Sequence, residues 1–124
     1  MIDVSLTFEA VGGPVELLGA AEKGYGGLTL RLRPSFKGGT LTTDQGALTK
    51  DSTNTPYRWA ALAARGHSVT VTAAADHPDA PIGWLLRTSY AGILNAAWPG
   101  LTPVTLQPGA PITLSYQVAV HHTP

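Results

Sequence analysis

The sequence of 124 residues contains no cysteine. Disulfide bonds, thiol nucleophiles and thiolate metal ligands are therefore excluded. Charged residues are also scarce, because they make up only 13% of the chain, against about 25% in an average domain. Eight basic and eight acidic residues give a formal net charge of zero. This balance argues against nucleic acid and against an anionic membrane surface as partners.

Long apolar runs are missing as well. None approaches the roughly 20 residues that a membrane-spanning helix needs. The first residues, MIDVSLTFEA, show neither the basic nor the apolar part of a signal peptide. We therefore expect a soluble protein whose compartment the sequence does not indicate, with residues 1–124 forming a single domain.

What the chain does contain is alternation of apolar and polar residues. Ile2, Val4, Leu6 and Phe8 are each followed by a polar residue, which is typical of a half-buried strand. The same reasoning predicts further strands at residues 15–18, 28–33, 41–43, 57–64, 68–75 and 103–122, the last interrupted at Pro108 and Gly109.

Two segments have competing interpretations. Residues 84–98 read as two strands with a bend at Gly92, or as a helix from Trp84 to Ala91 followed by a strand. The alanines of residues 57–64 favour a helix, although the alternation favours a strand. Residues 44–56 are polar and rich in turn formers, so we predict a long loop there.

Turn residues are frequent, with 14 glycines and 10 prolines spread between the short apolar stretches. No strand–helix–strand spacing is visible. The sequence therefore predicts an all-β fold, an antiparallel β-sandwich.

Histidine and acidic residues give one candidate for proton transfer. His77 lies between Asp76 and Pro78, in a stretch that Pro78 and Pro81 stiffen. A neighbouring carboxylate can fix the tautomer of an imidazole. Asp76 and Asp79 themselves read as turn formers, and the adjacent His121 and His122 read as a frayed chain end. The sequence shows no metal-binding motif, so we predict no metal and no cofactor.

Polar and aromatic residues form a second candidate set. Lys23 and Arg31 lie on either side of the glycines of GYGG (residues 24–27), which we interpret as a tight turn. Trp84, Arg87 and Tyr90 follow the His77 turn. Aromatic rings beside charged donors suit a sugar, because the ring stacks on its apolar face while the donors bind its hydroxyls. Trp59 and Trp98 are predicted core residues, and for Trp84 core and site are equally plausible.

These motifs, in this order, resemble the C-terminal half of the PmoA-like family. The resemblance rests on KGYGGLTLRLRP, DHPDAPIGWLLRTSYAGILNAAWPG and PVTLQPGAPITLSYQVAVHH. It implies a β-sandwich similar to part of the mutarotase-like supersandwich. The family carries the label methane oxygenase PmoA, but its function is unknown. The matching residues are Lys23, Gly26, Gly27, Arg31, His77, Pro78, Trp84, Arg87 and Tyr90.

The resemblance also implies a missing half, because members of that family are about twice this length. Half of a supersandwich would expose an apolar sheet face, which is unfavourable in water. We therefore expect a homodimer in which a second copy covers that face.

The first hypothesis for function is a carbohydrate-related protein that binds or acts on a sugar or polysaccharide. Its groove would be lined by Lys23, Arg31, Trp84 and Tyr90 with His77 and Arg87. If the protein is an enzyme, which the sequence leaves open, His77 would transfer protons and Arg87 would stabilise negative charge. The alternatives are a non-catalytic association module or fragment of a larger PmoA-like protein, and a metalloenzyme with a metal site at the dimer interface.

Overall fold

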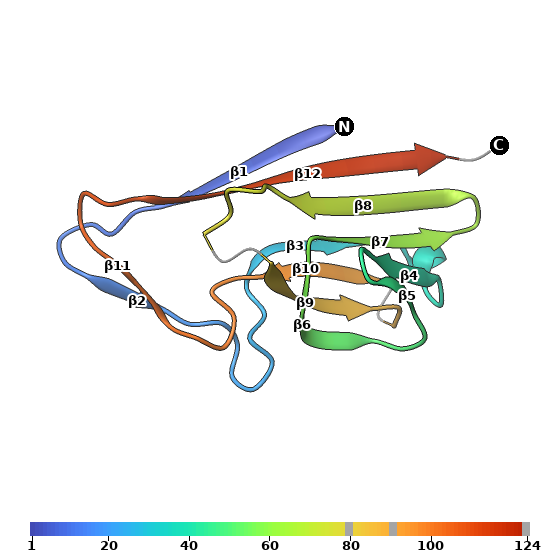
Figure 1. Cartoon of the computed structure of the whole chain (residues 1–124), viewed down its shortest axis with the longest axis horizontal. Helices are drawn as coiled ribbons and strands as arrows, with labels where there is room; N and C mark the ends of the chain where they lie inside the picture. Colours follow the sequence, from blue (N-terminus) through green and yellow to red (C-terminus); the bar gives the residue numbers. More distant parts are fainter. Residues whose placement is uncertain (79–80, 90–91, 123–124) are drawn as a thin grey trace.

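The computed structural model describes residues 1–78, 81–89 and 92–122, and in them every sheet pairing between strands is antiparallel. The predicted all-β sandwich is thereby confirmed. Figure 1 shows the two main sheets, with a narrow two-stranded ribbon extending from one end of the sandwich.

The larger sheet has six strands in the order β1-β12-β8-β7-β4-β5. Their bounds are β1 Ile2–Phe8, β12 Ile112–His122, β8 His67–Ala73, β7 Trp59–Ala64, β4 Thr40–Thr43 and β5 Gly46–Leu48. The burial of successive residues in this sheet agrees with the apolar–polar alternation of the sequence. In β8, for example, Val69 and Val71 are buried, while Thr70 and Thr72 face the other side.

The smaller sheet has four strands in the order β3-β10-β9-β6. Their bounds are β3 Gly27–Arg31, β10 Ile93–Ala97, β9 Ile82–Arg87 and β6 Ser52–Tyr57. A short 3-10 helix at Pro34–Phe36 connects β3 to β4. The β9 and β10 strands meet at the predicted bend, where Gly92 has a positive φ of 87°.

The core lies between the inner faces of these two sheets. Leu62 on β7 and Leu114 on β12 are fully buried, and so are Leu86 on β9 and Leu94 on β10. Because the inner faces cover each other, neither main sheet exposes the apolar face from which the homodimer was inferred. That reason for a homodimer is therefore wrong, although the oligomeric state itself stays a prediction.

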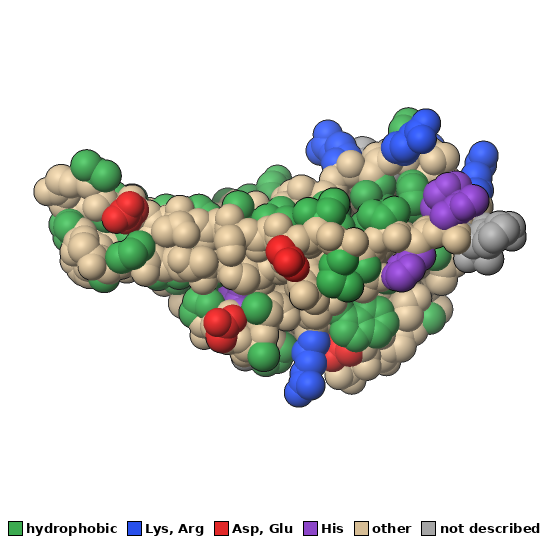
Figure 2. Space-filling model, turned by 90° about the horizontal axis from the view of Figure 1, so that it is seen from above, with side chains coloured by type: hydrophobic (Ala, Val, Ile, Leu, Met, Phe, Trp, Pro, Cys, Tyr) green, Lys and Arg blue, Asp and Glu red, His purple; other side chains and the backbone are tan. Residues whose placement is uncertain are grey.

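Exposed apolar side chains are concentrated elsewhere. The ribbon that projects from the sandwich is formed by β2 (Val15–Leu17) and β11 (Val104–Leu106). Val11 and Leu18, which flank β2, are 90% and 63% exposed. In Figure 2 the ribbon is the narrow extension at the left, and hydrophobic side chains are visible on its surface. Among the described residues, no helix has the length and the apolar character that crossing a bilayer would require.

Three sequence-based predictions need correction. The predicted loop at residues 44–56 contains β5 and β6, because β6 is an edge strand that tolerates Pro56 and a bulge near Asn54. The helix alternatives that begin at Tyr57 and at Trp84 are wrong, since the strands β7 (Trp59–Ala64) and β9 (Ile82–Arg87) run through these segments.

The third correction concerns the C-terminal histidines, which are not frayed. Both belong to β12, where His122 pairs with His67 of β8 and His121 pairs with Ser68. The rings of His67 and His122 lie 4.5 Å apart, centroid to centroid. The β12 strand therefore continues to its last described residue.

Candidate functional site

A hollow of about 290 Å³ lies on the outer face of the four-stranded sheet, and we call it the cationic hollow. Leu85 on β9 and Ile93 on β10 form its apolar floor. Its other lining residues carry polar or charged groups: Lys23, Tyr25, Thr29, Arg31, Arg87 and Asn95. Side chains from three strands and from the loop before β3 therefore meet around one small space.

The strand register brings two arginines together. Ile93 pairs with Arg31 on one side and with Arg87 on the other. Residues paired across neighbouring strands point to the same face, so both guanidinium groups flank Ile93 on the outer face. With strands about 4.8 Å apart, their Cα atoms are separated by roughly 10 Å.

Asn95 fixes the loop that supplies Lys23 and Tyr25. This side chain is fully buried. Its Nδ2 lies within hydrogen-bond distance of the carbonyl oxygens of Gly26 (2.8 Å) and Leu28 (2.9 Å) and of Oγ1 of Thr29 (2.8 Å). Its Oδ1 accepts a hydrogen bond from the amide of Gly26 at 3.3 Å. One amide thus ties the glycine turn to the sheet.

The glycine turn itself needs residues without a Cβ. Gly24 and Gly27 both have φ of 70°. A Cβ on Gly24 would lie 2.9 Å from Oδ1 of Asn54, whose Nδ2 donates a 2.8 Å hydrogen bond to the carbonyl of Lys23. The turn itself lies at residues 21–23, directly before these glycines, so the predicted tight turn is displaced toward the N-terminus. The hydrogen bond from Asn54 holds the backbone of Lys23 against β6.

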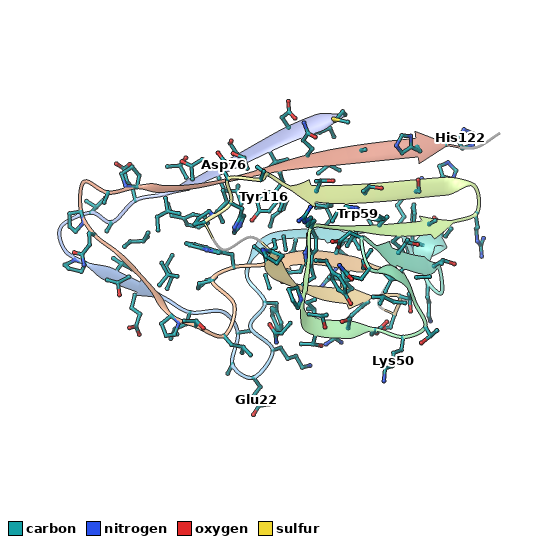
Figure 3. The ribbon with its side chains drawn as sticks, viewed as in Figure 1. Glu22, Lys50, Trp59, Asp76, Tyr116 and His122 are labelled. Carbon is teal, nitrogen blue, oxygen red and sulfur yellow. The ribbon has the colours of Figure 1, made fainter. Side chains whose placement is uncertain are left out.

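Carboxylates are absent from the described lining of the cationic hollow. Asp51, which directly precedes β6, is not among the lining residues. Its Oδ1 accepts hydrogen bonds from the amide (2.9 Å) and hydroxyl (3.2 Å) of Thr88, and its Oδ2 accepts one from Ser89 at 3.1 Å. Glu22 projects from the loop away from the sheets (Figure 3). The charge of the lining is therefore positive.

The structure brings together three of the six predicted site residues. Lys23, Arg31 and Arg87 line the cationic hollow. Tyr90 lies outside the described residues. The remaining two, His77 and Trp84, point elsewhere, so the predicted convergence of imidazole, indole and guanidinium is wrong.

Trp84 belongs to the core. It is fully buried, and its Nε1 donates a 2.8 Å hydrogen bond to the carbonyl of Tyr57 on β6. Its neighbours along β9 explain the difference: Leu85 and Arg87 face outward, so Trp84 faces the opposite side. A sugar ring bound at the surface cannot stack on this indole.

His77 is also buried, at 5% exposure, in the connection between β8 and β9. Its Nε2 lies 3.3 Å from Oη of Tyr116, and the two rings meet edge to face with centroids 5.8 Å apart. Tyr116 projects from β12 toward the interior (Figure 3). His77 therefore lies on the inner side of the fold, whereas Arg31 and Arg87 lie on the outer face of the four-stranded sheet. The predicted proton transfer by His77 next to Arg87 has no geometric basis.

A second, larger hollow of about 820 Å³ is lined by Trp59, Arg58, Asp44 and the start of the β8–β9 connection. Trp59 is half-buried and shares a face with its partner Thr72, so its assignment to the core is wrong. Trp98 is a core residue as predicted, 2% exposed and with its ring 5.2 Å from that of Phe8. In the described part of the chain, no group of three or more His, Asp or Glu residues lies close enough to hold a metal ion.

Comparison with known proteins adds a family but no activity. The whole chain, residues 1–124, matches a family of unknown function, DUF6807. The protein belongs to this family. No curated protein and no solved structure matches the chain. Inference about function therefore depends on the geometry of the sites.

Sequence reasoning missed five of the eight lining residues of the cationic hollow, and two of these matter most for the site. Tyr25 was treated only as part of a turn, yet it is 46% exposed and lines the hollow. Asn95 was not considered, although an amide inside the apolar run ILNAAW is itself a signal. A polar side chain in a buried strand needs partners, and here those partners are the backbone of the loop.

Replacing Asn95 by alanine should lower the free energy of unfolding by about 1–3 kcal/mol, because two backbone carbonyls and one amide lose their partner. Urea unfolding followed by circular dichroism measures the change. Thr29→Val, which removes only one acceptor of the same network, should cost less than half as much. Equal stability of Asn95→Ala and the unchanged protein would contradict the anchoring role.

Burial raises the pKa of Tyr116 to about 12 from 10.0. A raised pKa in the folded state means that the fold favours the protonated phenol. The stabilisation that comes from keeping the Tyr116 phenol protonated is complete below pH 10 and is lost as the pH rises through 12. At a pH of about 11, the unchanged protein should have lost roughly 1 kcal/mol more of its unfolding free energy than Tyr116→Phe, relative to pH 8. Urea unfolding at both pH values tests this, and equal losses in the two proteins would contradict it.

Proposed function

We propose that this protein is a carbohydrate-binding β-sandwich and that the cationic hollow is its binding site. The observation that carries the proposal is the convergence of Lys23, Arg31 and Arg87 with an exposed tyrosine around one hollow. Ligand sites commonly combine an apolar floor with a few placed polar groups, and Leu85 and Ile93 supply such a floor here. The resemblance to the PmoA-like family stays a prediction.

The arrangement supports binding rather than catalysis. Tyr25 offers an aromatic face to the apolar side of a sugar ring, and the cations offer hydrogen-bond donors to its hydroxyls. Glycoside hydrolysis normally uses two carboxylates. The described lining of the cationic hollow contains no carboxylate and no imidazole. This favours a binding module over an enzyme.

The second hollow provides the competing site, because Trp59 could also stack on a sugar. A screen of monosaccharides and oligosaccharides by isothermal titration calorimetry finds the ligand, and two matched aromatic variants then locate it. Tyr25→Ala should weaken binding about tenfold, which corresponds to about 1.4 kcal/mol, whereas Trp59→Ala should leave it unchanged. Both side chains are partly exposed, so both variants should fold. Loss of binding in Trp59→Ala alone would move the site to the other hollow and overturn the proposal.

We also propose that the protein is a homodimer, now on a different basis. The seven-residue strand β1 is an edge strand, with β12 on one side only. Edges of this length without proline are prone to pair with another chain. A second copy of β1, related by a two-fold axis, would pair with it antiparallel and extend the six-stranded sheet.

Light scattering after size-exclusion chromatography should give twice the 12.9 kDa of one chain. Ile2→Lys places a charge on the proposed interface and should shift the mass toward the monomer. Val11→Lys, at a position that is even more exposed but lies off this edge, is the control and should remain dimeric. A monomer at every concentration, or dissociation caused only by Val11→Lys, would contradict pairing through β1.

A further inference from the structure

The charge around the cationic hollow does not match the charge of the whole protein. The chain has eight basic and eight acidic residues. Three of the eight basic ones line this single hollow, and none of the acidic ones does so among the described residues. A neutral sugar needs donors and acceptors in similar number. A lining that offers cationic donors and no carboxylate acceptor instead favours a ligand with negative charge.

Two of these cations keep their charge available for a ligand. Within the described residues, no carboxylate forms an ion pair with Lys23 or Arg31. Lys23 and Arg31 reach the hollow from different elements, the loop and β3. Both cations are exposed, so a ligand can reach them without rearrangement of the core.

The geometry further distinguishes an anionic sugar from a simple anion. Arginine matches a planar carboxylate with two parallel hydrogen bonds. An inorganic anion would use the cations but leave Tyr25, Leu85 and Ile93 without contact. At about 290 Å³ the hollow is at the lower end of the range for ligand sites. This size suits one ring with one charged substituent better than an extended chain.

From these observations we infer that the ligand of the cationic hollow is a uronic acid residue, either free or within an acidic polysaccharide. The inference rests on the proposed carbohydrate-binding function and names its substrate class. The carboxylate lies between Arg31 and Lys23, and the sugar ring lies against Tyr25 and the apolar floor. No chemical step is involved.

Calorimetric titration with methyl β-glucuronide and with methyl β-glucoside tests the inference, because these differ only in the carboxylate. We expect at least tenfold tighter binding of the glucuronide at low salt. Raising the salt to about 1 M, where the Debye length falls to about 3 Å, should reduce that preference. Arg31→Gln and Lys23→Gln should each lower the preference for the glucuronide several-fold. Arg58→Gln removes one positive charge at the second hollow and should leave this preference unchanged.

The outcomes separate the two levels of the proposal. Equal binding of both glycosides, lost in Tyr25→Ala, would keep the carbohydrate site and overturn the uronic acid inference. Binding of inorganic phosphate or sulfate as tight as that of the glucuronide, unaffected by Tyr25→Ala, would identify a simple anion site and overturn both. Absence of binding to any sugar, including oligogalacturonides, would also overturn both.

Discussion

The hydrogen bonds of a single buried amide determine how the cationic hollow is built. Asn95 lies in the centre of the four-stranded sheet, and its side chain points to the outer face rather than to the core. There it holds the backbone of Gly26 and Leu28, so the loop before β3 must fold over the sheet. Together with the hydrogen bond from Asn54 to the carbonyl of Lys23, this contact fixes Lys23 and Tyr25 relative to Arg31 and Arg87.

The sandwich and the site use opposite faces of the same strands. In β9, Trp84 and Leu86 fill the core, while Leu85 and Arg87 form part of the hollow. The packing of the core residues therefore fixes the positions of the outward-facing residues, because a shift of the strand register by one residue would exchange the two faces. This coupling explains why the fully buried Trp84 is directly followed by Leu85, a residue of the proposed ligand site.

The fold was predictable from sequence where one face of a strand is apolar and the other polar. Alternation in Ile2–Phe8 and Ile112–His122 was sufficient, because each has one buried face. Alternation failed for β6, whose serine and threonine side chains carry little apolar signal. The glycines of residues 24–27 indicated the region of the turn before β3, because Gly24 and Gly27 have a positive φ that other residues rarely adopt, although the turn itself lies at residues 21–23.

The candidate site was predictable only in part. Residue type selected Lys23, Arg31 and Arg87, and their proximity depends on a register that no local pattern reveals. The same reasoning wrongly added His77 and Trp84. Both have polar atoms, but in each case that atom is satisfied inside the protein, by Tyr116 and by the carbonyl of Tyr57. Whether a polar group serves a ligand or the fold is decided by tertiary contacts.

The most direct test of this account is an NMR titration of the protein with sodium glucuronate, following assigned side-chain and backbone signals. The account predicts that the Nε–H signals of Arg31 and Arg87 and the amide signals of Gly26 and Gly27 shift together, while the indole signal of Trp59 stays in place. A titration that shifts the Trp59 indole and leaves both arginines unchanged would contradict it.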